Sequence, residues 1–166
     1  MEGVFLINMS NRFNIVKGSI EVIDIMVPLH LALFEELDKL KPLQEEHLLE
    51  TSTKDYLEKA LSNNEFISYI AETNSEAASI CGISLFVGSP HLKNSQGIEG
   101  YILSMYTVPK YRGNGLAKQL LGNCIEICKK SGVKRIWVHA SEDGKHLYRK
   151  MGFTYTLKNN EMELFL

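Results

Sequence analysis

A strand, a turn with two glycines and an amphipathic helix follow one another in the chain, and this unit limits the possible folds more than any other feature. Residues 100–108 are rich in β-branched and aromatic side chains and end at Pro109, which cannot donate a hydrogen bond to a neighbouring strand. From Leu116 to Cys128 apolar residues recur at helical spacing, and Gly132 is placed to end the helix. Such a helix must cover a sheet, so the sequence predicts an α/β fold with a mixed sheet (α+β).

The turn of this unit has the composition of an anion site. Gly113 and Gly115 flank Asn114, and glycine readily takes the positive φ values that let successive backbone N–H groups point into one concavity. The following helix adds its partly positive N-terminus, so the turn is suited to a pyrophosphate. A nucleoside-triphosphate loop would need Lys where Leu116 stands, and a dinucleotide fingerprint would need glycine in place of Lys118. A tight turn that binds no ligand remains the alternative.

The whole chain, residues 1–166, is predicted to form one domain, because no repeat, low-complexity tract or linker divides it. The predicted order is strand, two helices, three strands, helix, strand, helix and two strands, with Pro28 kinking or restarting the first helix. The predicted strands cover residues 12–17, 66–71, 80–87, 100–108, 134–140, 153–156 and 162–166. The predicted helices begin after Ser19, near Ser52 or Thr53, at Leu116 and at Gly144.

Charge, hydropathy and cysteine usage exclude several classes of protein. The 18 basic and 20 acidic residues leave a net charge of −2, too little positive charge to hold nucleic acid or an anionic membrane. The longest apolar stretch, residues 22–34, is interrupted by polar residues and is too short to span a bilayer. No secretory leader is recognised, so a cytoplasmic location is expected. The cysteines, Cys81, Cys124 and Cys128, lack metal-ligand spacing and are expected in the core, without a metal.

A second motif downstream, combined with the glycine turn, carries a family resemblance. The turn matches the pattern Arg/Gln-x-x-Gly-x-Gly/Ala through Arg112, Gly115 and Ala117. A later Leu-Tyr-x-x-x-Gly-Phe element is formed by Leu147, Tyr148, Gly152 and Phe153. On these residues the sequence resembles the GNAT superfamily of N-acetyltransferases, most clearly over a core of about residues 100–153. The resemblance implies a mostly antiparallel sheet that is splayed between its fourth and fifth strands and flanked by about four helices.

The resemblance also implies a reaction and the residues that serve it. The acetyl group of acetyl-CoA would pass to a primary amine of a small molecule or peptide by direct attack in a ternary complex, with no metal. A backbone amide near Tyr106 or Val108 would hold the oxyanion, and Tyr148 is the candidate general acid for the departing thiolate. The residues expected to bind acetyl-CoA are Tyr106, Thr107, Val108, Arg112, Gly113, Asn114, Gly115, Leu116, Ala117, Lys118 and Ser141.

Two positions depart from the family's pattern. Many members have Asn seven residues before the tyrosine, where this chain has Ser141, and some have a glutamate base six residues before the valine, where it has Ile102. The general base is therefore left unassigned; Glu99 and His139 are the nearest candidates in sequence, and each also fits a structural role. The alternative function is a domain of the same fold that binds an acyl-CoA without turnover, as a sensor or interaction module. A nucleotide-binding module is a third.

The acceptor side of the site gives weaker signals. Ser104 and Tyr106 share a strand face and are candidates to line the cleft. Residues 162–166 are apolar, which leaves open a homodimer that pairs or exchanges strand edges. Acidic residues of the first helix and the following loop would attract a cationic amine, although a solvated helix face explains them equally well. They are Glu35, Glu36, Asp38, Glu45, Glu46 and Glu50.

Overall fold

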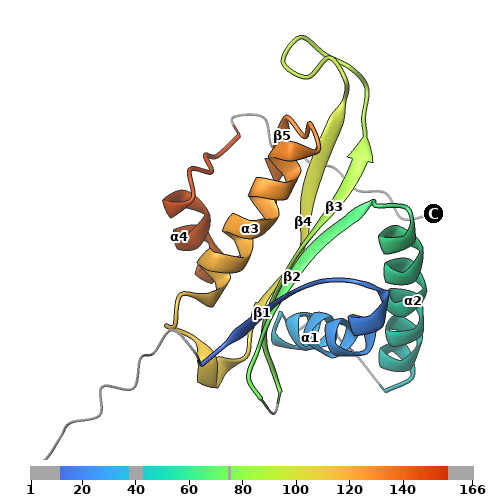
Figure 1. Ribbon diagram of the computed structural model, residues 1–166, viewed down its shortest axis with the longest axis vertical. Coiled ribbons are helices and arrows are strands. Elements are labelled where there is room, and N and C mark those ends of the chain that lie inside the picture. Colours follow the sequence, from blue (N-terminus) through green and yellow to red (C-terminus); the bar gives the residue numbers. More distant parts are fainter. Residues whose placement is uncertain (1–11, 38–42, 75, 157–166) are drawn as a thin grey trace, which may run out of the picture.

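The computed structural model describes residues 12–37, 43–74 and 76–156, which form a five-stranded sheet between two layers of helices (Figure 1). Four strands pair with one another in chain order, and each pair is antiparallel: β1 (Asn14–Lys17), β2 (Phe66–Glu72), β3 (Ala77–Val87) and β4 (Ile98–Thr107). The short β5 (Arg135–Trp137) lies beside β4 and runs parallel to it. The predicted mixed and mostly antiparallel sheet is thereby confirmed.

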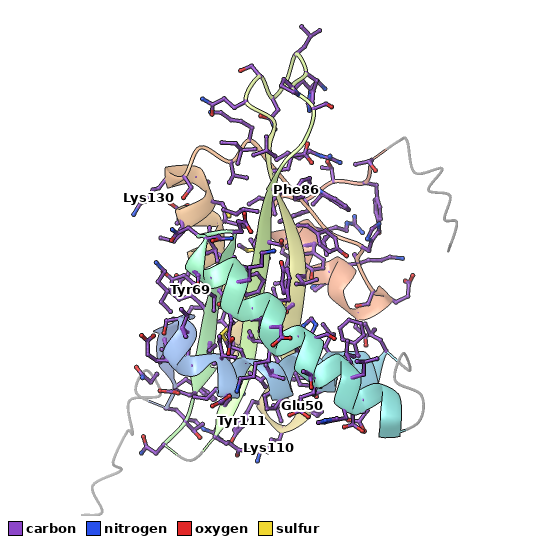
Figure 2. All side chains as sticks on the ribbon, turned by 90° about the vertical axis from the view of Figure 1, so that its right-hand side faces the viewer. Glu50, Tyr69, Phe86, Lys110, Tyr111 and Lys130 are labelled. Carbon is purple, nitrogen blue, oxygen red and sulfur yellow. The ribbon has the colours of Figure 1, made fainter. Side chains whose placement is uncertain are left out.

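The helices lie on both faces of the sheet (Figure 1). One face is covered by α1 (Ile23–Glu36) and α2 (Leu43–Ser62), and the other by α3 (Leu116–Lys130) and α4 (Glu142–Lys150). Figure 2 shows α2 as the outer of the first two helices. Two 3₁₀ turns, η2 (Ile20–Val22) and η3 (Pro109–Tyr111), lead toward α1 and α3.

Alternation along the strands divides the core into two layers. In β2, Phe66 and Ile70 pack with the side chains of α1 and α2, whereas Ile67 and Ala71 belong to the cluster beneath α3. The helix predicted from Leu116 is confirmed: its apolar stripe is buried, and Gly132, which follows it, has φ +79°. Periodicity therefore predicts which face each element buries.

Several predicted boundaries are wrong. Pro28 lies inside α1, so the helix does not restart there, and the predicted kink stays a prediction. The second helix begins at Leu43, nine residues before the expected Ser52. Residues 46–48 and 50 are exposed, Leu48 by 67%, so no buried apolar stripe marks this part of the helix. Residues 153–156 form no strand, since the backbone N–H of Phe153 instead donates to Tyr148 O at the end of α4. The strand predicted over residues 162–166 lies outside the described residues.

The three cysteines are free and buried, as predicted. Cys124 Sγ lies 3.6 Å from Cys81 O, so α3 packs directly on β3 at this point. Burial raises the pKa of Cys128 to about 12, so this thiol stays protonated at neutral pH. Among the described helices, none is long and apolar enough to cross a membrane.

The sheet opens between β4 and β5. These strands pair only from Glu99–Arg135 to Tyr101–Trp137, and β4 then continues to Thr107 with no partner on that side among the described residues. The strand predicted over residues 134–140 is therefore shorter than expected, because residues 138–140 do not pair with β4. The splay predicted between the fourth and fifth strands is present, and it exposes the edge of β4.

A β-bulge lies in β4 just beyond this point. Gly82 pairs with Ser104 and Ile83 pairs with Ile102, so Leu103 is an extra residue without a partner on β3. Leu103 packs against the α1 layer, and Ser104 also contacts α1, so the usual alternation is interrupted here. The bulge decides which groups of β4 face the opening.

Candidate active site

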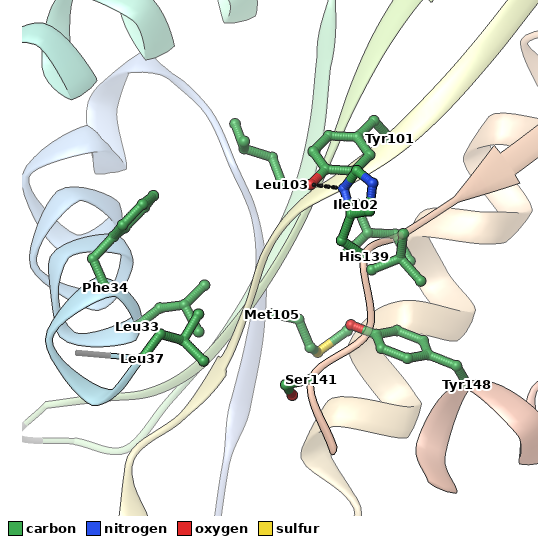
Figure 3. A pocket seen from close by; sticks show the side chains of 11 residues that line it. Leu33, Phe34, Leu37, Tyr101, Ile102, Leu103, Met105, His139, Ser141 and Tyr148 are labelled. Atoms are coloured by element: carbon green, nitrogen blue, oxygen red, sulfur yellow. Dashed lines mark hydrogen bonds between the residues drawn. The ribbon is translucent and has the colours of Figure 1, made fainter. Parts of the chain in front are cut away.

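A cavity of about 320 Å³ fills the gap where β4 and β5 part, and we call it the first cavity. Figure 3 shows α1 on one side of it, β4 across its floor, and Ser141 and Tyr148 on the other side. Its lining residues are Leu33, Phe34, Leu37, Tyr101, Ile102, Leu103, Met105, Val138, His139, Ser141 and Tyr148. The structure thus brings Tyr148 and Ser141 together in one cavity.

Tyr148 is placed by the short helix α4. Its ring packs against Phe153, with 5.5 Å between ring centroids, and the side chain is only 6% exposed. Its hydroxyl group points into the first cavity (Figure 3). Desolvation by burial raises the pKa of Tyr148, so the phenol keeps its proton at neutral pH. A protonated hydroxyl in this position can donate a hydrogen bond to a leaving group.

Ser141 serves both the helix and the cavity. Its Oγ accepts a hydrogen bond from the backbone N–H of Gly144 (3.2 Å), which makes Ser141 the N-cap of α4. The hydroxyl proton remains available to a ligand in the first cavity. A serine can therefore cap the helix that carries Tyr148 and still contact a bound molecule.

Gly144 allows Tyr148 to lie close to its own helix, so we expect Gly144→Ala to lower kcat about tenfold. A Cβ at this position would lie 3.0 Å from Tyr148 Cε2 and 3.2 Å from Ser141 Oγ, which displaces the ring by a few tenths of an ångström. Small displacements of a reacting group are costly, since about 1 Å can cost about 100-fold. Steady-state kinetics measure the change, with Gly122→Ala in α3 as the matched control because its Cβ meets only Met151 Cε at 3.9 Å. Equal kcat values for both variants would contradict this account.

The predicted phosphate cradle lies where β4 leads into α3. Gly113 and Gly115 have φ values of +80° and +75°, and an added Cβ at either position would meet nothing within 4 Å. The side-chain amide of Asn114 donates to Tyr111 O (2.8 Å) and holds the turn in shape. The backbone N–H groups of residues 113–118 have no hydrogen-bond acceptor within the described chain. The cradle therefore presents unpaired N–H donors toward open space, which fits a pyrophosphate.

Arg112 connects this turn to two other elements. Its Nε donates to Thr107 O (3.0 Å), and its guanidinium forms an ion pair with Glu36 at the end of α1. Lys110, in the preceding turn, pairs with Glu76 (2.5 Å), and Figure 2 shows Lys110 and Tyr111 at the same end of the molecule. Arg112 thus fixes the cradle by structural contacts, and its contact with a ligand stays a prediction.

The register of β4 shows which backbone groups face the opening. Val108 N donates to Ala78 O (2.9 Å), so the N–H of Val108 and, two residues earlier, both backbone groups of Tyr106 face β3, whereas Val108 O accepts from Tyr111 N (2.8 Å) in the next turn. Met105 and Thr107 must direct theirs toward the unpaired edge. Among the predicted residues Tyr106, Thr107 and Val108, only Thr107 therefore directs backbone groups there, and its C=O already accepts from Arg112 Nε. Met105 is the residue that sequence reasoning missed.

A second cavity of about 350 Å³ adjoins the first on the α1 and α2 side, and it shares Tyr101 and Leu103 with it. Its lining residues are His30, Leu49, Ser52, Thr53, Tyr56, Leu57, Ser84, Tyr101 and Leu103. His30 is 6% exposed, and its Nδ1 lies 2.8 Å from Ser104 Oγ on β4. Ser104 and Tyr106 were expected to line the cleft, but neither lines the first cavity, and Ser104 instead contacts His30.

Burial lowers the pKa of His30, and this predicts a loss of stability in mild acid. In the unfolded chain the histidine has a pKa of about 6.5, so below that pH it binds a proton that the folded protein does not bind. The free energy of unfolding therefore falls as the pH drops below that value. We expect the His30→Asn variant to lose less stability than the wild type between pH 7.5 and pH 5. Urea unfolding at each pH measures this, and identical pH dependence in both proteins would refute it.

The two candidate bases named from the sequence have different surroundings. Glu99 forms an ion pair with Arg135 (2.9 Å) where β4 and β5 still pair, and it lines neither cavity. His139 lines the first cavity, with Nδ1 3.2 Å from Tyr101 Oη (Figure 3). Of the acidic cluster, Glu36 pairs with Arg112, and no described carboxylate lines either cavity. Asp38 and the side chain of Glu45 lie outside the described residues.

Comparisons with known proteins agree with this geometry. The family model described as the acetyltransferase (GNAT) family matches residues 31–153. A predicted acetyltransferase from Clostridium acetobutylicum, solved with acetyl-CoA, is 27% identical, with a TM-score of 0.82 over 92% of this chain and 96% of that chain. A GCN5-related N-acetyltransferase from Ralstonia eutropha has 20% identity and a TM-score of 0.77, over 91% of this chain and 98% of that chain. A search of curated protein sequences gives no match.

Proposed function

Because the chain belongs to the acetyltransferase (GNAT) family, we propose that it transfers the acetyl group of acetyl-CoA to a primary amine by direct attack within a ternary complex. One observation carries the proposal: the cradle of unpaired N–H donors and the cavity that holds Tyr148 are joined by the open edge of β4. A pyrophosphate on the cradle would let the attached arm run along this edge toward Tyr148. The Clostridium relative, whose structure contains acetyl-CoA, supports the same choice of co-substrate.

Different residues of the chain would bind the co-substrate and catalyse the transfer. The N–H groups of residues 113–118 would bind the pyrophosphate, and Lys118 is exposed beside them and can pair with it. Thr107 and Met105 would pair with the pantetheine arm in the manner of an added strand. The amide of Met105 would hold the oxyanion, and Tyr148 would donate to the sulfur that leaves; both residues line the first cavity.

We further propose a cytoplasmic setting and an amine carried by a small molecule or a peptide. The three free cysteines are typical of a reducing compartment. A homodimer through residues 162–166 remains an expectation from the sequence alone. The acceptor amine meets β4 from the side of α1, which borders both cavities.

Two measurements test the proposal. We expect acetyl-CoA and CoA, but not ATP or NAD, to raise the melting temperature, since a ligand at about 100 times its Kd adds about 2.7 kcal/mol to the free energy of unfolding. We also expect release of free thiol when acetyl-CoA and a panel of amines are supplied together. Stabilisation without thiol release would favour the non-catalytic sensor or interaction module. No stabilisation by CoA in the folded wild type would overturn both functions.

A further inference from the structure

The second cavity has an unused histidine in its wall. Among the residues described, His30 has one hydrogen-bond partner, Ser104 Oγ, and this contact uses Nδ1. The other ring nitrogen, Nε2, has no partner among the described residues and is not fully buried. It is therefore accessible to solvent. His30 lines the second cavity and is 6% exposed, so the accessible space beside its ring is that cavity.

The histidine also lies close to the reaction centre. Its partner Ser104 is adjacent in β4 to Met105, which lines the first cavity, and to Leu103, which lines both cavities. On α1, His30 stacks edge to face with Phe34 at 4.9 Å between ring centroids, and Phe34 lines the first cavity. The two cavities therefore share Leu103 and Tyr101 in their lining, and the contacts of His30 connect it to residues of the first cavity.

We infer that the second cavity receives the acceptor amine and that Nε2 of His30 is the general base that takes its proton, an inference that rests on the proposed acetyltransferase function. In the tautomer that carries its proton on Nδ1, the neutral ring donates to Ser104 Oγ and directs a lone pair from Nε2 into the cavity. Burial, which lowers the pKa of His30, keeps the ring neutral and able to accept a proton at pH 7.

The lining also indicates the class of amine. Leu49, Leu57 and Leu103 supply apolar surface. Apart from His30, the polar side chains of the lining carry hydroxyls, such as that of Tyr56, which donates to Ser84 Oγ (2.8 Å). No described carboxylate, lysine or arginine lines either cavity, so a polyamine or an anionic acceptor would leave its extra charges unpaired. The cavity fits a primary amine carried on an apolar body.

The proton transfers balance. One ammonium proton passes to Nε2 of His30 and then to solvent, and the neutral nitrogen forms a bond to the thioester carbonyl carbon. As the carbon–sulfur bond breaks, the sulfur takes a proton from Tyr148. The second proton that the nitrogen loses then reprotonates the phenolate of Tyr148. The products are an amide, CoA with a free thiol and one released proton.

The first test reads the histidine directly, without turnover. Protein with isotope-labelled histidine is saturated with CoA, which has no acetyl group to transfer, and 2-phenylethylamine is added while the imidazole signals are followed by NMR. The His30 signals are identified by their absence from His30→Asn. We expect 2-phenylethylamine, but not spermidine, to shift the Nε2 signal of His30. An unmoved His30 signal would overturn the inference.

The second test separates catalysis from structure. In His30→Asn the amide nitrogen can replace Nδ1 toward Ser104, while Nε2 is lost, so we expect kcat/KM for 2-phenylethylamine to fall about 100-fold, a typical effect of a general base. Stabilisation by acetyl-CoA should be unchanged, and His47→Gln, at an exposed position on α2, should keep wild-type kinetics. A kcat/KM within threefold of the wild type, or the full loss in His139→Gln alone, would overturn the role of His30. If acetyl-CoA still stabilises the protein and thiol is still released, the proposed function stands without the inference.

Discussion

Gly115→Trp is expected to lose acetyl-CoA binding by at least about 100-fold, or about 2.7 kcal/mol, while the protein stays folded. The position has φ +75° and faces open space, so an indole ring would project into the concavity where the N–H groups of residues 113–118 converge. The ring would exclude a pyrophosphate from those donors. Calorimetric titration with acetyl-CoA measures the loss directly.

The control for this variant is Gly132→Trp, at the opposite end of α3. Gly132 has φ +79°, and the nearest atom to an added Cβ is Gln96 Oε1 at 3.7 Å, so both variants carry a similar backbone strain of about 1–2 kcal/mol. We expect both to melt at lower temperature than the wild type, and only Gly115→Trp to lose acetyl-CoA. Equal affinities in the two variants would show that the turn is structural and binds no phosphate.

Tyr148→Phe is expected to lower kcat about 100-fold without changing the affinity for acetyl-CoA. The hydroxyl reaches the first cavity and has no hydrogen-bond partner among the described residues, so its removal leaves the packing of the ring intact. A thiol has a lower pKa than a phenol, so a thiolate does not readily remove the proton of Tyr148. The Tyr148 hydroxyl therefore acts first as a hydrogen-bond donor to the sulfur, and the proton transfer is completed when the nitrogen releases its proton. This places the expected effect at the lower end of the range for general acids.

Single-turnover kinetics with acetyl-CoA and an accepted amine measure this step apart from product release. Tyr155→Phe is the control, because Tyr155 is 69% exposed and lines neither cavity. An unchanged rate of acetyl transfer in Tyr148→Phe would remove Tyr148 from the mechanism. A lower affinity for acetyl-CoA with an unchanged rate would make it a binding residue.

Much of the fold could be predicted from the sequence because its signals are local. The stripe of α3, the glycines of the turn and the burial of the cysteines each depend on residues close together in the chain. Boundaries failed where a helix buries little, as at residues 46–48 of α2. They also failed where a strand needs a distant partner, as at residues 138–140 and 153–156.

The site was less predictable, because two of its features depend on the register between strands and on contacts across the fold. The bulge at Leu103 changes which residues of β4 face α1, and the pairing of Val108 with Ala78 leaves Met105, not Tyr106, facing the opening. His30 is 74 residues from Ser104 in the chain and stands in an apolar helix, where it is indistinguishable from a core histidine by sequence. Tyr148 and the cradle could be named because a motif marks each of them.

The open edge of β4 also has a consequence for the protein in solution. Residues 102–107 present strand backbone that no described segment covers on the side away from β3. Uncovered strand edges are templates for pairing with another chain, and they promote aggregation when they stay open. An arm lying along β4 would act as a sixth strand, so the co-substrate would protect the protein from self-association as well as supply the acetyl group. Samples kept with CoA should therefore remain monodisperse for longer than samples kept without it.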